Sequence, residues 1–211
     1  MPDRDHANIL ENVAAYYSTK IQEFGPTSKG VDWRDESSHV IRHRQFLYLI
    51  REEFDAHICD LGCGYGHFLS FLRASGFTGQ YTGYDISPDM LAAARAHHGD
   101  NDKQRWKLAS KPEGRYDFTI ASGIFNVRPG AEESAWETYI FDTIEVMHRA
   151  SDRGFAFNLL STSSDPDRRR QDLYYADPVK FLVSCTSRYG RRVALLQDTD
   201  LFEFTMIIRN A

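Results

Sequence analysis

Short apolar runs alternate with longer stretches of helical periodicity along most of the chain. Each apolar run is bounded by glycine or polar residues, as β-strands are. These runs predict strands at 56–61, 80–84, 104–108, 117–121, 154–160, 192–197 and 201–209. The periodic stretches predict helices at 65–75, 88–98, 132–147 and 178–188. Strands that alternate with helices in this way are typical of an α/β fold with a parallel sheet.

Local signals sharpen the pattern at three places. Ser87-Pro88-Asp89 combines an N-cap, a proline at the first helical position and an acid at the positive helix end. Asp177-Pro178 opens another helix. Residues 198–200 are too few for a parallel crossover, so the last two strands must pair antiparallel. We therefore predict a doubly wound, seven-stranded, mostly parallel sheet that ends in an antiparallel hairpin.

The first 54 residues are predicted to form a helical cap on the same unit, and residues 55–211 the main domain. An apolar stripe of Ile9, Leu10, Val13, Tyr16 and Tyr17 marks the first cap helix. Glycines and a proline near residues 25–30 then break the chain. A second helix is expected over 37–54.

Composition supports one packed domain, because 42% of the 211 residues are hydrophobic and 13% are aromatic. The net charge of −5 disfavours a broad phosphate-binding surface, so nucleic acid is not the expected partner. The most basic segment, Arg168–Arg170, has Asp165, Asp167 and Asp172 beside it, which makes a solvated loop the favoured interpretation.

The compartment is inferred from cysteines and termini. Three cysteines, Cys59, Cys63 and Cys185, have no metal-like spacing and form an odd set, which argues for a reducing compartment. No apolar run is long enough to span a membrane, and no secretion signal is apparent at the start of the chain. We expect a cytoplasmic protein without a membrane partner, and a homodimer stays open.

The segment most informative about function is 58–68, Ile-Cys-Asp-Leu-Gly-Cys-Gly-Tyr-Gly-His-Phe. An apolar strand ends in Asp60 and continues into three alternate glycines, which allow a sharp turn and close approach of a ligand to the backbone. The free N–H groups of the following helix then point at the site. The next strand delivers Asp85, whose carboxylate is suited to ribose hydroxyls.

A dinucleotide-binding Rossmann protein is the main competing interpretation. Its G-x-G-x-x-G fingerprint would need a third glycine at position 67, which is a histidine. The acid at position 60 would also repel a pyrophosphate, whereas it suits the ammonium of a methionyl group.

These residues together resemble the cofactor motif of class I S-adenosylmethionine-dependent methyltransferases, over roughly residues 56–209. The resemblance implies S-adenosylmethionine as cofactor and S-adenosylhomocysteine as product. It places the glycine loop at the methionyl group, Asp85 at the ribose, and Ile86 and Met90 at the adenine. Many relatives have an adenine-binding acid after the third strand, and this chain has Ala109 and Ser110 there. The full implied cofactor set is Asp60, Gly62, Gly64, Tyr65, Gly66, Asp85, Ile86, Met90, Ala109, Ser110, Ser122 and Gly123.

The acceptor is expected at loops beyond the carboxyl ends of the strands, at 123–131, 161–176 and 198–200. Residues 122–127 and 155–160 look like small methyltransferases encoded beside polysaccharide and natural-product genes, which favours a small-molecule or glycan-type acceptor. The loop at 161–176 is either a lid or substrate wall, or is anchored to the core by its tyrosines. The predicted substrate-binding residues are Phe125, Asn126, Arg128, Tyr174 and Tyr175.

Transfer to a hydroxyl also needs a group that takes up the proton, and histidine suits neutral pH. His39 and His43 share one face of the second cap helix and are the predicted catalytic residues, with O-methylation slightly favoured. One alternative is that the two histidines only pack against the edge of the core. Another is that they bind a metal together with Asp35, but we expect no metal. His67 is expected to face the cofactor rather than act as a base.

Aromatic side chains of the cap are further candidates for the cofactor site. Tyr16, Tyr17 or Trp33 could lie against the cofactor sulfonium, although core packing is the default for such residues. Two other functions stay open at this point. One is methylation of tRNA or protein, and the other is a non-catalytic cofactor-binding scaffold for a partner protein.

Overall fold

A central sheet organises the molecule, and a computed structural model describes the backbone of residues 2–210 and the side chains of residues 7–210. Seven strands follow the order β3-β2-β1-β4-β5-β8-β7, and a two-residue strand, β6, pairs with β5. The strands are β1 (His57–Leu61), β2 (Gln80–Asp85), β3 (Gln104–Leu108), β4 (Tyr116–Ala121), β5 (Ser151–Ser161), β6 (Tyr175–Ala176), β7 (Val193–Leu196) and β8 (Glu203–Arg209).

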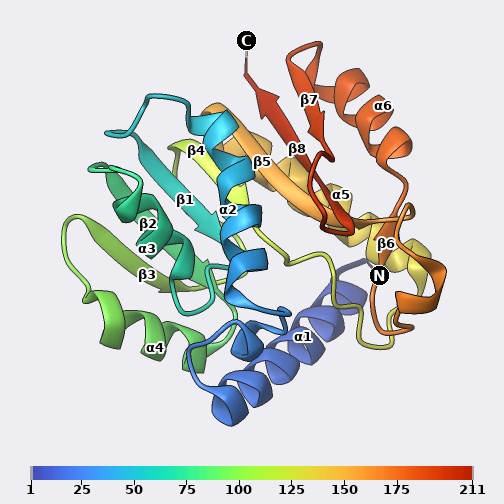
Figure 1. Cartoon of the computed structure of the whole chain (residues 1–211), viewed down its shortest axis with the longest axis horizontal. Helices are drawn as coiled ribbons and strands as arrows, with labels where there is room; N and C mark the ends of the chain where they lie inside the picture. Colours follow the sequence, from blue (N-terminus) through green and yellow to red (C-terminus); the bar gives the residue numbers. More distant parts are fainter. Residues whose placement is uncertain (1, 211) are drawn as a thin grey trace.

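The predicted topology is confirmed. Strands β3, β2, β1, β4 and β5 are parallel, whereas β8 pairs antiparallel with both β5 and β7. The connection between β7 and β8 spans residues 197–202, longer than the predicted 198–200 but still too short for a parallel crossover. In Figure 1 the parallel strands point their carboxyl ends toward α1, so that helix lies across the edge of the sheet at which an α/β fold binds its ligand.

Helices cover both faces of the sheet. They are α1 (Pro2–Phe24), α2 (Glu36–Ile50), α3 (His67–Ala74), α4 (Pro88–His98), α5 (Glu133–Ala150) and α6 (Pro178–Tyr189), with short 3₁₀ turns η1 (Lys29–Val31) and η2 (Pro166–Arg168). The predicted caps are present. Ser87 accepts from the N–H of Met90, and Asp177 accepts from the N–H of Val179.

Two hydrophobic cores result from the alternation of side chains along the strands. On one face, Phe155 and Phe157 of β5 pack with α5 and α6. On the other, Ala156 of β5 and Ile58 of β1 pack with residues of α2, α3 and α4. Neighbouring positions on β5 therefore serve opposite cores, which is why the strand reads as a continuous apolar run.

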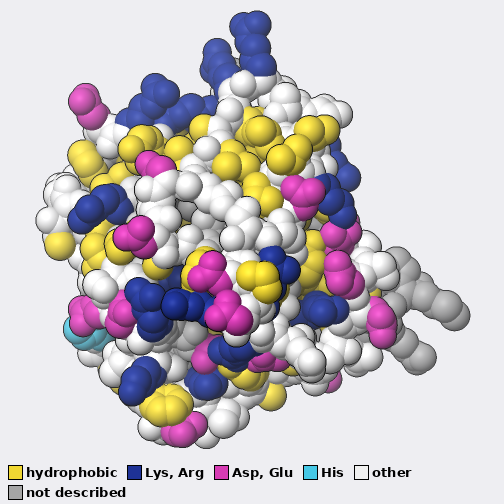
Figure 2. Space-filling view, turned by 45° about the vertical axis from the view of Figure 1, so that its right-hand side comes forward, with side chains coloured by type: hydrophobic (Ala, Val, Ile, Leu, Met, Phe, Trp, Pro, Cys, Tyr) yellow, Lys and Arg dark blue, Asp and Glu magenta, His cyan; other side chains and the backbone are white. Residues whose placement is uncertain are grey.

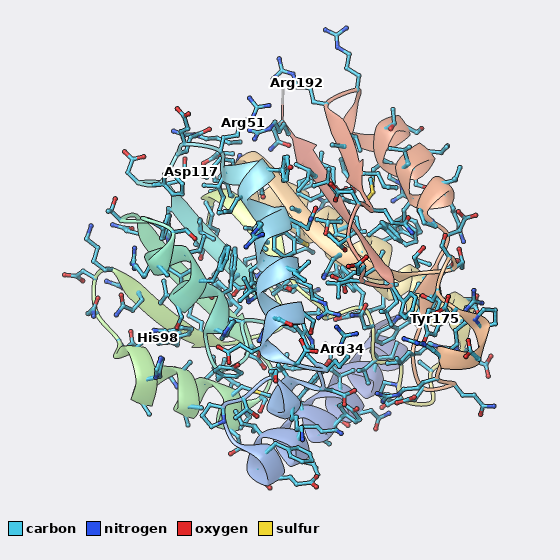
Figure 3. All side chains as sticks on the ribbon, in the orientation of Figure 1. Arg34, Arg51, His98, Asp117, Tyr175 and Arg192 are labelled. Carbon is cyan, nitrogen blue, oxygen red and sulfur yellow. The ribbon has the colours of Figure 1, made fainter. Side chains whose placement is uncertain are left out.

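Several boundaries differ from the prediction. Helix α2 ends at Ile50 rather than at residue 54, because Arg51 adopts φ 55° and donates its N–H back to the carbonyl of Leu47. Figure 3 places Arg51 at the end of the sheet opposite α1. Strand β5 begins at Ser151, three residues earlier than expected. The loop 161–176 contributes β6, whose pairing with β5 depends on tertiary contacts that no local pattern encodes.

Charged side chains of both signs are interspersed over most of the face seen in Figure 2. The Arg168–Arg170 segment follows this pattern, since Arg170 pairs with Asp172 and Arg168 lies near Asp165. Within the described residues, no helix combines the length and apolar character needed to cross a membrane.

Candidate active site

A cavity opens where the carboxyl ends of β1, β2 and β4 meet the helical cap. The motif residues of the main domain, among them Asp60, Gly62, Gly64 and Asp85, form one wall, which we call the cofactor wall. The opposite wall comes from α1, η1 and α2 and includes Tyr17, Val31 and Trp33. Of the twelve predicted cofactor residues, eleven line the cavity: Asp60, Gly62, Gly64, Tyr65, Asp85, Ile86, Met90, Ala109, Ser110, Ser122 and Gly123.

Gly66, the twelfth, has a structural role. It is the N-cap of α3 at φ 84°, and a Cβ there would come within 2.6 Å of Trp106 and 2.8 Å of His98. His98 is the last residue of α4 (Figure 3). This glycine therefore permits close packing of α3 against the β3 edge.

Backbone conformation and backbone hydrogen bonds fix the glycine loop, residues 62–66. Gly62 and Gly64 adopt φ of 76° and 53°, a region that favours glycine. The N–H groups of Gly62 and Cys63 both donate to the carbonyl of Tyr84, at 2.7 and 2.9 Å, which ties the loop to β2. A Cβ on Gly62 would come within 2.1 Å of Ile124, so the loop has no room for a side chain at that position.

Asp60 is a buried carboxylate with a free acceptor. Its side chain is 2% exposed, one oxygen accepts from the hydroxyl of Tyr81, and Oδ1 has no hydrogen-bond partner among the described residues. Burial raises the pKa of Asp60 to about 7, and the nearby charge of Asp85 acts in the same direction. A cationic ligand group at Oδ1 would relieve this cost, so the site fits the ammonium of a methionyl group.

Asp85 links the glycine loop to the segment that follows β2. One of its oxygens accepts from the N–H of Gly64 and the other from the N–H of Ser87, each at 2.8 Å. Burial raises the pKa of Asp85, while these backbone N–H groups oppose that shift. A carboxylate has about four lone-pair sites. Asp85 therefore keeps acceptor capacity for a ligand diol on its cavity side.

Ser122 and Gly123 line the cavity after β4, and Gly123 is held by a buried polar chain. The N–H of Gly123 donates to Oδ1 of Asn158 at 2.7 Å, and the Asn158 amide donates to Glu203 at 3.2 Å. Glu203 in turn pairs with Arg42 of α2 at 2.6 Å. This chain connects the cap, β8, β5 and the loop after β4, so it fixes the cap relative to the cofactor wall.

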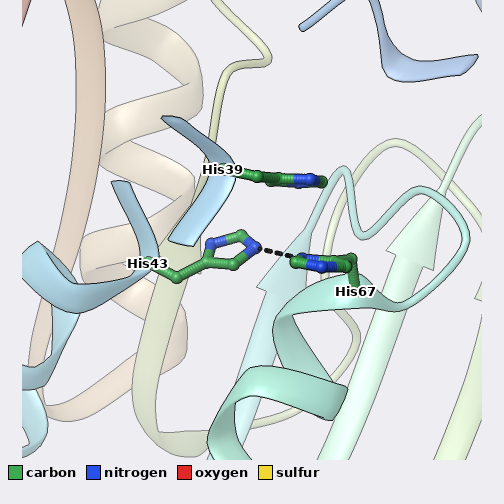
Figure 4. Close-up of side chains that lie close together, drawn as sticks. All are labelled: His39, His43 and His67. Atoms are coloured by element: carbon green, nitrogen blue, oxygen red, sulfur yellow. Dashed lines mark hydrogen bonds between the residues drawn. The ribbon is translucent and has the colours of Figure 1, made fainter. Parts of the chain in front are cut away.

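Three histidines meet at the cap side of the cavity, and we call His39, His43 and His67 the histidine cluster (Figure 4). The rings of His39 and His67 stack with centroids 4.0 Å apart and planes 13° apart. Nε2 of His43 lies 3.1 Å from Nδ1 of His67, at hydrogen-bond distance. The indole of Trp33 packs on the ring of His39, with the two ring centroids 4.1 Å apart.

Burial keeps the cluster neutral. It lowers the pKa of His39 to about 2, helped by the nearby charges of His67 and Arg42. Burial also lowers the pKa of His43 to well below its usual value, and it lowers the pKa of His67. The Nδ1 atoms of His39 and His43 are buried without a partner among residues 7–210. The cluster thus offers neutral imidazole nitrogens to the cavity.

His67 and Asp35 differ in their relation to the cluster. His67, expected to face the cofactor, lines the cavity and also joins the two predicted histidines, whereas Asp35 is not part of the cluster. Asp35 is instead the N-cap of α2, where it accepts from the N–H of Ser38. Of the cap aromatics, Tyr17 and Trp33 line the cavity, and Tyr16 donates to Asp32.

The five predicted substrate residues are not among those that line this cavity. They make contacts that shape the loops, and a role for them in substrate binding stays a prediction. Phe125 is in the core, Asn126 accepts from the N–H of Leu160, Arg128 donates to the carbonyl of Ala131, Tyr174 donates to Glu137, and Tyr175 accepts from the N–H of Arg170.

The loop 161–176 also reaches the cap. Arg170 donates to Asp32 at 3.1 Å, and Lys20 of α1 lies 3.2 Å from the same carboxylate. Asp32 itself has φ 56°, an uncommon conformation for a residue other than glycine. These contacts join the loop to the segment that holds Val31 and Trp33 against the cavity.

Comparisons with known proteins agree with this geometry. The family model described as "Methyltransferase domain" matches residues 10–129. "Putative methyltransferase Rv1506c" of Mycobacterium tuberculosis is 44% identical over 154 residues, which cover 73% of this chain and 93% of the relative. The chain therefore belongs to the class I S-adenosylmethionine-dependent methyltransferases, and S-adenosylmethionine is its cofactor.

Solved structures share the fold at low identity. The DhpI–S-adenosylhomocysteine complex superposes with a TM-score of 0.64 at 14% identity, covering 96% of this chain and 97% of DhpI. Magnesium protoporphyrin IX methyltransferase of Synechocystis PCC 6803, solved with S-adenosylmethionine, gives 0.60 at 13% identity, covering 83% of this chain and 81% of that one.

Proposed function

We propose that this methyltransferase transfers the methyl group to a hydroxyl of a small-molecule or glycan-type acceptor. The observation that supports this most is the histidine cluster, which lines the same cavity as Asp60, the glycine loop and Asp85. The cofactor supplies an activated methyl group on a sulfonium. The protein contributes alignment of the acceptor and exclusion of water, both of which the cap provides by closing over the cavity.

A hydroxyl acceptor must lose its proton as the new C–O bond forms, whereas an amine or carboxylate acceptor would require no strong base. The described lining includes three imidazoles in the same cavity as Asp60 and the glycine loop, which favours the hydroxyl. Nδ1 of His39 has no hydrogen-bond partner among the described residues, so this nitrogen is free to meet an acceptor. We assign the handling of this proton to His39 and His43.

The competing acceptor, tRNA, would need a basic cleft beside the cavity. The segment that could supply one, Arg168–Arg170, is engaged with Asp165, Asp172, Asp32 and backbone carbonyls. The observed pairing leaves little free charge for phosphates, so we favour the small acceptor.

The test is transfer of labelled methyl from S-adenosylmethionine to a panel of small hydroxylated compounds and glycans. We expect His39→Gln and His43→Gln to lower turnover by at least tenfold while the affinity for S-adenosylhomocysteine stays within twofold. His97→Gln, at an exposed position on α4, is the matched control. Full activity in both cluster variants, or transfer to RNA but to no small acceptor, would refute the proposal.

A further inference from the structure

The histidine cluster has the composition of a metal site. His39 and His43 lie one turn apart on α2, and His67 is the first residue of α3, so two elements bring three imidazoles to one point. One nitrogen from each ring can be chosen so that all three lie within 4.8 Å of one another. We propose that the cluster binds one divalent transition-metal ion, with Zn²⁺ as the ion to test first.

The unpaired nitrogens are the first argument. His39 is 4% exposed and His43 is 2% exposed, and Nδ1 of each is buried without a partner among the described residues. A buried polar group left in this state costs on the order of 1–3 kcal/mol. Packing alone explains why apolar rings would gather under Trp33, but it does not explain three imidazoles. Coordination through Nδ1 of His39 would use a lone pair that the protein otherwise leaves unmatched, whereas His43 would coordinate through Nε2, which faces His67.

The spacing is the second argument. Zn–N bonds of 2.0–2.1 Å in a tetrahedral site place ligand nitrogens about 3.3 Å apart. Nε2 of His43 and Nδ1 of His67 are already 3.1 Å apart. The ring of His39 is stacked on His67 and must turn about its last torsion to direct a nitrogen at the same point, a rotation that costs little in a broad, two-fold torsion.

The surroundings are the third argument. Nε2 of His67 lies 4.0 Å from a carboxylate oxygen of Glu36, which is placed to orient the ring while Nδ1 serves as ligand. Arg42, whose charge acts on His39 and His43, is already paired with Glu203. Three protein ligands leave one position open, and because all three histidines line the cavity this position faces it.

The catalytic consequence depends on the proposed function, whereas metal binding itself does not. The ion would acidify an acceptor hydroxyl bound at its open coordination position. The hydroxyl proton would then go to solvent, a C–O bond would form as the C–S bond breaks, and the C–S electron pair would stay on the sulfur. With the ion bound, His39 and His43 would act as its ligands, and this role would replace the proton handling assigned to them under the proposed function.

The direct experiment is a calorimetric titration of untagged, chelator-stripped protein with ZnCl₂, repeated with CoCl₂ and read by visible absorption. We expect one equivalent of zinc per chain and a tetrahedral cobalt spectrum. Binding should weaken at least 100-fold in His43→Gln and in the partly exposed His67→Gln. His97→Gln should bind as the parent protein does.

Each outcome separates the two proposals. Affinity for S-adenosylhomocysteine within twofold of the parent shows that a variant has kept its fold. Absence of zinc binding in the parent protein, or zinc binding unchanged in both folded variants, overturns the metal site; methyl transfer in that same protein leaves the proposed function standing. Zinc binding without transfer to any hydroxyl acceptor supports the metal site and counts against the proposed function.

Discussion

Replacement of Asp60 by Asn tests the electrostatics of the cofactor wall without any ligand. The folded protein holds this carboxyl at a pKa of about 7, against roughly 3.9 in an unfolded chain. A difference of about three units corresponds to ~4 kcal/mol at 1.36 kcal/mol per unit. Because the folded pKa is raised, the stabilising effect of the protonated carboxyl is complete below pH ~4 and is lost as the pH rises through 7.

The expected result is a difference in slope. Integration of these pKa values gives a loss of about 2 kcal/mol in the free energy of unfolding of the parent protein between pH 5 and 7. Asp60→Asn cannot ionise and should lack this loss. His39 and His43, neutral in the fold, contribute a slope of the opposite sign in both proteins, so it cancels in the comparison.

The assay is urea unfolding of both proteins at pH 5, 6, 7 and 8, with exposed Asp55→Asn as the control. Parallel pH profiles for the parent protein and Asp60→Asn would refute the reasoning about this buried carboxylate. A second readout follows from the same residue. Cofactor affinity should rise with pH in the parent protein, because the ligand ammonium pairs with the ionised form, and it should be weak and flat in Asp60→Asn.

Two further substitutions test the geometry of the site. Gly62→Ala should abolish measurable cofactor binding and destabilise the fold by about 1–3 kcal/mol, because its Cβ would clash with Ile124. Gly130→Ala is the control. It also lies at positive φ but has open space around it, so it should cost only backbone strain of ~1 kcal/mol. Glu203→Ala should cost about 3–5 kcal/mol in chemical unfolding because it leaves Arg42 buried and unpaired, and a cost below 1 kcal/mol would contradict that role.

The cofactor wall was predictable because its residues follow from short segments. Asp60 and the glycines lie on one strand and the turn after it, and parallel strands bring their carboxyl ends to one edge, so Asp85 and Ser122 join them. Gly66 differs because its constraint comes from Trp106 and His98, which are distant in sequence. Local pattern cannot reveal such a contact.

The acceptor side was less predictable because it depends on how separate elements dock. The position of His67 beside His43 is set by the packing of α2 on α3, which an amphipathic pattern does not specify. The path of the loop 161–176 is likewise set by β6 and by the Arg170–Asp32 pair. Its tyrosines therefore looked available in the sequence, whereas the structure gives each a hydrogen-bond partner.

A calorimetric titration with S-adenosylhomocysteine, run on the parent protein and on Asp85→Ala, addresses the cofactor site most directly. One nucleoside should bind per chain, and the variant should bind at least tenfold more weakly, because it loses the acceptor for the sugar diol and the anchor of Gly64 and Ser87. Equal affinity in the two proteins, or no heat of binding in either, would contradict the site as described.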